Sequence, residues 1–413
     1  MSPIFLGGAL QNLSLAARNL LRQRRRTLLA LATVCGGVIA YLLAGGFIAW
    51  VLQSMRDGAI YSQLGHIQIT RPGYFQKGIA DPYRYLLPRE TDIVTADGST
   101  GIRTVAPRLA FSGLISRGDA TVSFIGEGID PVLEEPITLG VILAAGKDLI
   151  EGGPQSVMLG EGLAENLGAK PGDTVVLLST TAQGGVNAVE LTVSGLFATA
   201  SKAFDDGALR VPIEVSRTLM RVDGATSWAV LLERTDTTDA YVAKLRARLP
   251  PTEFEIIPWS DLADFYNKTV ELFTRQVGIV RLLIAMIVIL SISNTLSMAV
   301  IERTGEIGTA MALGVRRRGI LGLFVSEGVV LGLLGGTLGL ALGVALGLVL
   351  SKIGIPMPPP PGMGRGYVGA IVITPTLALD AFLLAFVTTL IANIFPAWKA
   401  SRMNIVDALR HQK

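Results

Sequence analysis

Four long apolar runs alternate with polar stretches along this chain. The first has no charged side chain from Thr27 to Met55, and the second has none from Leu282 to Ile301. The third extends from Gly328 to Ser351, and the fourth from Thr376 to Trp398. A helix needs about 20 apolar residues to cross a hydrocarbon core about 30 Å thick. Each run therefore predicts a membrane-spanning helix, and we expect the first to be an uncleaved anchor.

The long segment between the first two runs has a different pattern. Apolar and polar residues alternate in HIQIT (66–70), TVSFIG (121–126) and VELTVSG (189–195), with Gly, Pro and Asp at the turns between such stretches. EGLAENLGAK (161–170) and TDAYVAKLRARL (238–249) have helical patterns. This predicts a mixed α/β, β-rich domain inserted between the first and second spans, large enough to bury its own core.

Basic residues indicate the orientation of the spans. They are concentrated before the first span (Arg18, Arg22, Arg24, Arg25, Arg26), after the second (Arg303, Arg316, Arg317, Arg318) and in the tail (Lys399, Arg402, Arg410, Lys413). Because basic loops stay in the cytoplasm, both termini and residues 302–318 are expected there. The large domain is expected on the periplasmic or extracellular side of the cytoplasmic (inner) membrane.

The expected organisation has nine segments. They are a cytoplasmic amphipathic helix (1–26), a first span (27–53), the large domain (54–262), a stalk and second span (263–301), a charged cytoplasmic segment (302–318), a third span (319–351), an outer loop (352–375), a fourth span (376–398) and a cytoplasmic tail (399–413).

Composition supports a membrane protein and excludes several activities. Half of the 413 residues are hydrophobic, 17 % are charged and the mean hydropathy is +0.50. A net charge of +3 with no basic block among aromatics argues against nucleic acid as a partner. The single cysteine, Cys35, allows no internal disulfide, and no His/Cys/Asp cluster has the spacing of a metal site. We expect no catalytic residue, no metal and no cofactor bound by this chain, and we expect the acid pairs 134–135 and 205–206 to be solvated turns.

The charged segment 302–318 is the strongest candidate for a functional site. Small or apolar residues occupy one helical face and charged residues the others: Ile301, Gly305 and Gly308 against Glu302, Arg303 and Glu306. Gly314 is suited to end this helix, because glycine accepts the left-handed conformation found at many helix C-termini. The arginines that follow are suited to anionic head groups. The segment is either a positive-inside loop or a docking helix for a cytoplasmic partner, and the pattern alone leaves both open.

A family resemblance extends over nearly the whole chain. ERTGEIGTAMALGVRRRGILGLFVSEGVVLGLLGG resembles the FtsX-type permease domain of ABC transporters, the group that includes MacB and the lipoprotein-releasing Lol permeases. The residues at the family's motif positions are Glu302, Arg303, Glu306, Ile307, Gly308, Ala312, Leu313, Gly314 and Glu327. FPAWKASRMNIVDALR resembles the family's terminal motif, and GHIQITRPGYF (65–75) resembles the Lol-type branch. Met311 stands where the family has Arg or Lys, and Ile405 where it has Pro.

This resemblance implies a function. It implies a permease subunit that works with a separate cytoplasmic ATPase dimer, which would bind ATP and Mg, and with a second permease copy, identical or related. Residues Glu302, Arg303, Glu306, Ile307, Gly308, Ala312 and Gly314 would then couple to the ATPase. The expected substrate is a lipoprotein, lipid or other amphiphile, extracted or exported by mechanotransmission. The alternative is an FtsX-like signalling subunit that activates an external cell-wall hydrolase.

Other positions carry narrower expectations. Glycines at every fourth position of the third span predict close helix packing: Gly335, Gly339, Gly343 and Gly347. Bulky residues of the first and second spans are candidates for an acyl-chain cavity, as in the Lol relatives: Phe47, Ile48, Trp50, Val51, Met55, Phe273 and Val277. Arg281 and Glu327, near span ends, could contact head groups or serve function. The run PMPPPPGMGRG (356–366) is expected to be a stiff connector.

Overall fold

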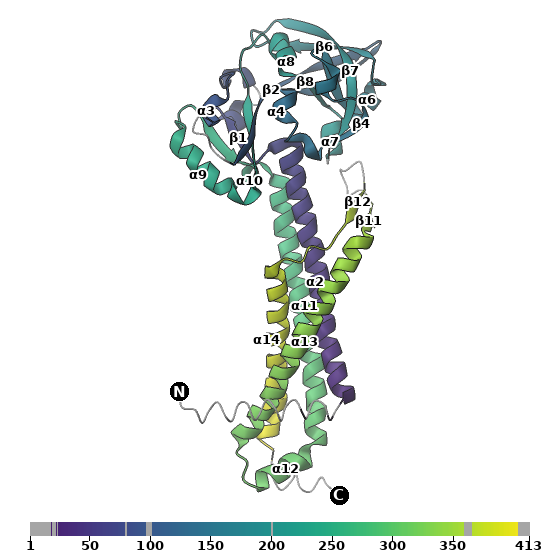
Figure 1. Ribbon diagram of the computed structural model, residues 1–413, viewed down its shortest axis with the longest axis vertical. Helices are drawn as coiled ribbons and strands as arrows, with labels where there is room; N and C mark the ends of the chain where they lie inside the picture. Colours follow the sequence, from purple (N-terminus) through teal and green to yellow (C-terminus); the bar gives the residue numbers. More distant parts are fainter. Residues whose placement is uncertain are drawn as a thin grey trace. The chain divides into compact units, whose positions relative to one another are not determined.

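Four long helices dominate the computed structural model, which describes residues 18, 22, 24–78, 81–95, 101–199, 201–358 and 366–403 (Figure 1). They are α2 (Arg24–Ala59), α11 (Asp264–Glu302), α13 (Arg317–Ile353) and α14 (Pro375–Ser401). All four are long and apolar enough to cross a membrane, which confirms the prediction of four spans. Most of the expected helix 1–26, the tail beyond residue 403 and most of the proline run lie outside the described residues.

The chain divides into two compact units. Residues 1–52, 269–356 and 368–413 form one, here called the helical unit, and residues 53–268 and 357–367 form the other, here called the β-rich unit. The helical unit also contains the short helix α12 (Thr304–Ala312). Strands β11 (Ile355–Met357) and β12 (Tyr367–Gly369) pair in the loop between α13 and α14.

The β-rich unit is built on one ten-stranded sheet. Its strands are β1 (Ile67–Thr70), β2 (Ile102–Arg117), β3 (Ala120–Ile129), β4 (Ile142–Gly146), β5 (Ser156–Gly160), β6 (Thr174–Thr180), β7 (Val186–Ala198), β8 (Ala208–Pro212), β9 (Ser227–Leu232) and β10 (Glu255–Pro258). The order is β10-β1-β9-β2-β3-β8-β5-β7-β4, and β6 pairs with both β2 and β7. The pairings of β2, β3, β8, β5, β7 and β6 therefore close a ring.

Short helices complete the β-rich unit. The α-helices are α3 (Asp92–Thr95), α4 (Pro131–Glu134), α5 (Leu149–Gly152), α6 (Glu161–Leu167), α7 (Lys202–Asp205), α8 (Ile213–Met220), α9 (Thr238–Arg248) and α10 (Trp259–Leu262). The π-helical turns are η1 (Ile60–Leu64) and η2 (Tyr74–Gly78), and the 3₁₀ turns are η3 (Pro82–Arg84), η4 (Thr138–Gly140) and η5 (Thr235–Thr237).

Two apolar clusters support this sheet. Strand β6 alternates exposed and buried residues, so that Val175 and Leu177 point into a cluster with Phe111 and Phe124. A second cluster lies where α9 covers β1, β9 and β10, around the fully buried Trp228. The prediction of a β-rich mixed domain between the first and second spans is confirmed.

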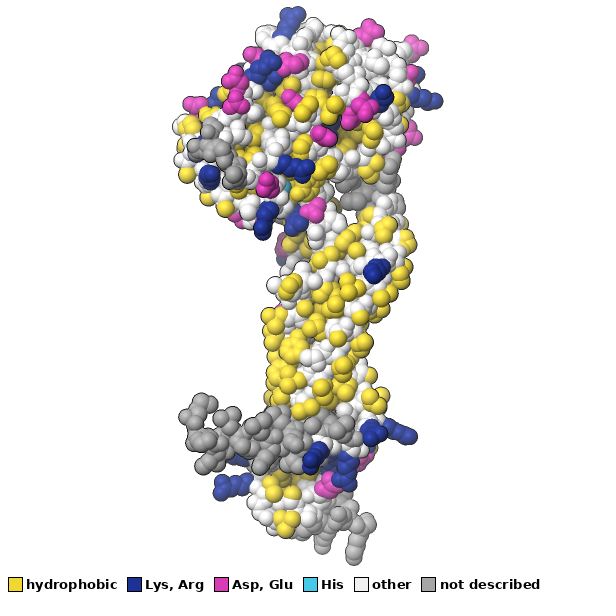
Figure 2. Space-filling model, viewed as in Figure 1, with side chains coloured by type: hydrophobic (Ala, Val, Ile, Leu, Met, Phe, Trp, Pro, Cys, Tyr) yellow, Lys and Arg dark blue, Asp and Glu magenta, His cyan; other side chains and the backbone are white. Residues whose placement is uncertain are grey.

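The helical unit keeps its apolar side chains on the outside as well as inside. In Figure 2 hydrophobic side chains cover the visible face of the long helices, whereas charged side chains are frequent over the β-rich unit. In α11 only 11 % of the most apolar stretch is buried, against 33 % in α2 and in α13 and 39 % in α14. The most apolar stretch of α11 is therefore the least buried of the four, which leaves it accessible to lipid or another protein chain.

Candidate coupling surface

Helix α12 lies between the second and third spans, and its end is defined by a glycine. Gly314 has a φ of 95°, which favours glycine, and its N–H donates to the carbonyl of Met311 over 3.0 Å. The N–H of Val315 donates to the carbonyl of Ala310 over 3.1 Å. These two bonds satisfy carbonyls at the helix C-terminus. The chain then turns, and α13 begins at Arg317.

One face of α12 is buried within the helical unit. Ile307, Gly308 and Met311 are its buried residues. Ile307 and Met311 belong to an apolar cluster with Ile320 and Phe324 of α13, Val300 of α11, and Ala397 and Ala400 of α14. Three of the four spans therefore contribute to the surface on which α12 is held. Met311, where the resemblance leads one to expect a basic residue, is part of this contact.

The opposite face of α12 and the turn after it are exposed. Exposed residues include Glu302, Glu306, Thr309, Ala312, Leu313, Gly314 and Val315. Leu313 is 83 % exposed and Val315 46 % exposed. Leu313 is an exposed apolar side chain next to acidic residues, and the opposite face of α12 is packed against the spans. Such a surface is suited to binding a protein partner. Arg316, Arg317 and Arg318 are exposed at the start of α13.

Ion pairs connect the two acids of this surface to α2 and to the chain before it. Glu302 pairs with Arg26 of α2. Glu306 lies 4.0 Å from Arg22, and both of those side chains are largely exposed. An exposed pair at this distance contributes little stability, so Glu306 is available to a partner at small cost.

Arg303 differs from the expectation that it projects to the partner. Its Nη1 donates to Oε1 of Glu327 over 3.1 Å, and the two side chains are 13 % and 4 % exposed. Burial next to an apolar span is costly for a lone charge, and pairing offsets much of that cost. Arg303, Ile307 and Gly308 therefore point toward the interior of the helical unit. The accessible surface consists of the exposed acids Glu302 and Glu306 together with Leu313.

The third span uses glycines on two faces. A Cβ on Gly335, Gly339 or Gly343 would lie 2.7–2.8 Å from Val34, Val38 or Leu42 of α2. Gly347 faces Ile373 instead, at 3.0 Å. A second set faces α14, where a Cβ on Gly328, Gly332 or Gly336 would approach Asn393, Phe386 or Phe382. Helix α13 is thus packed closely between two neighbours.

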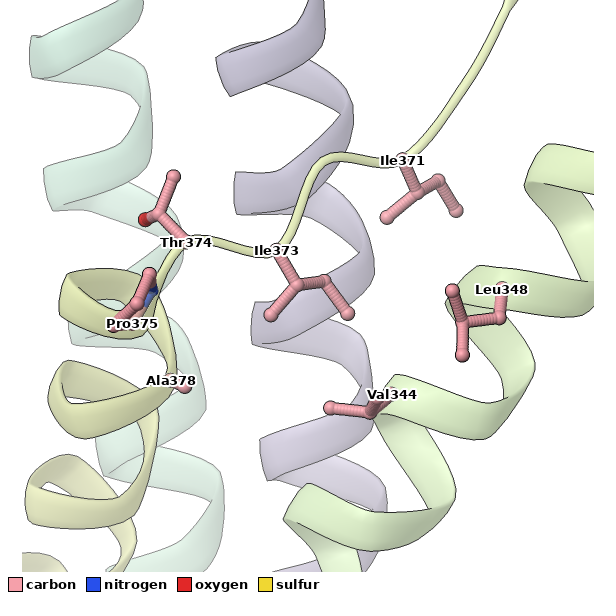
Figure 3. A pocket seen from close by; sticks show the side chains of 7 residues that line it. All are labelled: Val344, Leu348, Ile371, Ile373, Thr374, Pro375 and Ala378. Atoms are coloured by element: carbon pink, nitrogen blue, oxygen red, sulfur yellow. The ribbon is translucent and has the colours of Figure 1, made fainter.

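The residues expected to form an acyl-chain cavity lie apart from two cavities of the described residues. Phe47, Ile48, Trp50, Val51, Met55, Phe273 and Val277 are half-buried, and none of them lines either of two cavities found there. One cavity, of about 280 Å³, lies between α13 and the segment leading into α14 (Figure 3). It is lined by Val344, Leu348, Ile371, Ile373, Thr374, Pro375 and Ala378. The other, of about 580 Å³, lies in the β-rich unit beside Tyr74, Tyr83 and Phe111.

The structure also shows where Arg281 and the two acid pairs lie. Arg281 of α11 lies 3.6 Å from Asp380 of α14, and both are about half exposed. The expectation of solvated acid pairs was wrong for Glu134 and Asp205, which are 1 % and 6 % exposed. Asp205 accepts hydrogen bonds from the Thr199 amide and hydroxyl, and burial raises its pKa against the effect of those bonds. Within the described residues no group of three His, Cys, Asp or Glu could hold a metal ion.

Comparison with known proteins supports the resemblance. The family model described as FtsX-like permease C-terminal matches residues 278–405, and the MacB-like periplasmic core domain model matches residues 27–248. Lipoprotein-releasing system transmembrane protein LolC of Xylella fastidiosa is 27 % identical over 339 residues, 74 % of this chain and 77 % of the relative. Macrolide export ATP-binding/permease protein MacB of Rhodospirillum rubrum is 26 % identical over 419 residues, 96 % of this chain and 60 % of the relative.

Solved structures were compared as well. The periplasmic region of MacB from Actinobacillus actinomycetemcomitans aligns with 54 % of this chain and 97 % of its own, with 16 % identity and a TM-score of 0.37. The two family models together reach from the first span to the tail, and the first of them covers the segment that contains α12. The chain therefore belongs to the FtsX/MacB family of ABC transporter permeases.

Proposed function

We propose that this permease couples a cytoplasmic ATPase dimer to the movement of an amphiphilic substrate, and that α12 with its following turn is the coupling surface. The observation that carries the proposal is the two-sided character of α12. Ile307 and Met311 are buried against three spans, while Glu306 and Leu313 are exposed on the other side. A force applied to the exposed side is therefore passed to the spans through close-packed side chains.

The chemistry of the surface indicates how the ATPase would bind. Leu313 would enter an apolar pocket, and Glu306 would pair with a basic group beside it. Replacing Glu306 with lysine removes an attraction and buries a like charge, a loss of about 2–5 kcal/mol. This corresponds to tens- to thousands-fold weaker association.

The test is recovery of the ATPase with the tagged, full-length permease from mild detergent. We expect Glu306→Lys and Leu313→Asp to reduce recovery strongly. Two variants match them in chemistry at sites away from α12: Glu271→Lys, on an exposed acid of α11, and Ile353→Asp, at the far end of α13 with Ile353 74 % exposed. Gly308→Leu is unsuitable, because Gly308 is buried within the permease itself. Undiminished recovery in both α12 variants would show that the segment is only a linker.

The proposed substrate is a lipoprotein or another lipid-bearing molecule. The name of the Xylella relative refers to lipoprotein release, and the most apolar stretch of α11 is less buried than those of the other spans. In this proposal two permease copies would enclose the substrate's acyl chains between their α2 and α11 helices, near Trp50 and Phe273. The ATPase dimer of this proposal would bind the ATP and Mg.

A photo-crosslinking amino acid tests the substrate class. Placed at Trp50 or Phe273, it should capture a lipoprotein or lipid in cells, whereas placed at Leu338, an exposed apolar position of α13, it should capture bulk lipid only. Capture of a cell-wall hydrolase by the β-rich unit, with no lipoprotein at Trp50 or Phe273, would instead identify the FtsX-like signalling function.

A further inference from the structure

Buried charged residues of the β-rich unit converge on the end of the first span. Arg108 of β2 and Arg210 of β8 are 2 % and 3 % exposed. The Nη1 of Arg108 donates to the backbone carbonyl of Gln63, and the Nη2 of Arg210 donates to that of Ser62 over 3.0 Å. Both carbonyls belong to η1, the turn that continues α2.

These carbonyls are the kind that need an outside donor. The last carbonyls of a helix have no partner within it, and they carry the negative end of the helix dipole. The turn η1 ends at Gly65, whose N–H donates to the carbonyl of Ile60 over 2.9 Å. Ser62 and Gln63 come just before this end. A guanidinium matches both the missing hydrogen bond and the negative charge.

Two glutamates hold the arginines in place. Both oxygens of Glu134, which is 1 % exposed, accept hydrogen bonds from Arg108. Glu127 lies between the two arginines, with carboxylate oxygens 3.6 Å from each. The guanidinium of Arg210 also lies over the Phe197 ring, 5.3 Å from its centroid. Each arginine is thus held by contacts within the β-rich unit, while one of its guanidinium nitrogens donates to a carbonyl of η1.

Apolar contacts and one close backbone approach hold the same turn. Ile60 is fully buried in a cluster with Ala106, Ile137 and Leu231. A Cβ on Gly140 would lie 2.9 Å from the carbonyl oxygen of Tyr61, so this close approach requires glycine. Buried contacts within the β-rich unit therefore hold η1 in addition to the two arginines.

A role in stability alone explains this cluster poorly. Buried ion pairs add little to stability compared with apolar residues of the same volume. Here both arginines donate to carbonyls of η1, the turn that continues the span, and not to carbonyls of their own strands. We propose that Arg108 and Arg210 are positioning residues that fasten the outer end of the first span to β2 and β8, so that movement of the span is carried into the β-rich unit. The transmission part of this inference rests on the proposed function.

Two variants test the fastening. Because Arg108→Leu alone would leave Glu134 buried without its partner, the pair is removed together as Arg108→Leu with Glu134→Leu, and Arg210→Met is made separately. The control is Arg117→Leu, which removes another arginine of β2, one that donates to the Gly168 carbonyl over 2.7 Å and pairs with Asp173. Hydrogen exchange of the full chain in lipid nanodiscs measures protection of the amides in residues 60–66 and, separately, in β5.

We expect exchange in 60–66 on the order of tenfold to a hundredfold faster in both test variants, since each loses a hydrogen bond from a charged donor. Protection in β5 should stay unchanged, and the control should match the wild type. In the reconstituted complex, ATPase recovery should persist while ATP-driven substrate release falls at least about tenfold.

Two results would overturn the inference. One is unchanged protection of 60–66 in both test variants, and the other is normal substrate release despite lost protection. A wild-type complex that releases nothing would count against the proposed function, whereas the exchange measurement would still decide whether the arginines fasten the span.

Discussion

The helical unit and the β-rich unit bury charge very differently. In the described part of the helical unit Glu327 is the one charged residue that is buried, and it pairs with Arg303. Five charged residues are buried among those described in the β-rich unit: Arg108, Glu134, Asp205, Arg210 and Arg217. A span must leave water for hydrocarbon, so a charge inside it is tolerated only near an end and with a partner. A folded domain surrounded by water can hold several buried charges when oppositely charged groups lie close to one another.

Breaking the one buried pair of the helical unit should have the largest effect. Arg303→Met removes the guanidinium that pairs with the buried Glu327, at a cost of about 3–5 kcal/mol. We expect a strongly lowered melting temperature of the purified full chain. Arg303→Met with Glu327→Met should recover much of the loss, because it removes both charges. If the single variant melts like the wild type, the Glu327 carboxylate is not held by Arg303.

The β-rich unit should instead respond to pH through His66. Its Nδ1 accepts from the Leu232 N–H over 3.1 Å, so the proton is on Nε2, which lies 2.9 Å from the Thr235 hydroxyl. Burial, and then the nearby charge of Arg56, lower its pKa to about 4, while Asp57 opposes this.

The sign of the effect follows from the lowered pKa. His66 binds its proton near pH 6.5 in the unfolded chain but only near pH 4 in the folded unit. The stability that the neutral His66 contributes is therefore fully present above pH 6.5 and is lost as the pH falls through 4. The loss should approach about 3 kcal/mol. Hydrogen exchange of β9 at pH 7, 5 and 4 measures it, with His66→Gln as the variant that removes this titration. Equal pH dependence in both chains would contradict the assignment.

Close packing of the helical unit can be tested at a glycine. A Cβ on Gly339 would lie 2.8 Å from the Cβ of Val38 and 3.0 Å from the Cα of Cys35. Gly339→Leu should therefore separate α13 from α2 and cost about 1–3 kcal/mol. Gly36→Leu is the control, since nothing lies within 4 Å of its Cβ position. Thermal unfolding that is equally lowered in both variants would mean that leucine itself, and not the contact, is responsible.

The contrast between the helical unit and the β-rich unit also explains which features the sequence could predict. Hydrophobic runs and glycines at every fourth position are local patterns, so they predicted the four spans and indicated that α13 packs closely. The hydrogen-bond partners of Arg108 and Arg210 are 26 to 148 residues away in the chain. No spacing rule connects Glu134 with Arg108, and the neighbouring Glu135 made a solvated turn the natural interpretation. Buried charge networks depend on sheet topology, which the sequence pattern did not supply.

The coupling segment lies between these cases. Its helical pattern and Gly314 predicted a short helix that ends where the structure ends it. The pattern could not tell that Arg303 turns toward Glu327, because the contact joins two elements 24 residues apart. Motif positions shared with a family therefore divide into an exposed set, available to a partner, and a buried set that holds the segment in place.

The smallest predicted effect concerns the turn that supplies Glu134 to Arg108. Asp130 caps α4, and its Oδ1 accepts from the amides of Val132 and Leu133 over 3.0 and 3.1 Å. Asp130→Ala removes this cap and should cost about 1 kcal/mol. Because α4 positions Glu134, part of the loss should appear as faster exchange in residues 60–66, through the weakened hold on Arg108. Asp148→Ala, which removes the cap of α5 at the Glu151 amide, is the matched control. It should cost a similar amount of stability without affecting residues 60–66. Equal exchange of 60–66 in the two variants would mean that the cap of α4 does not support Arg108.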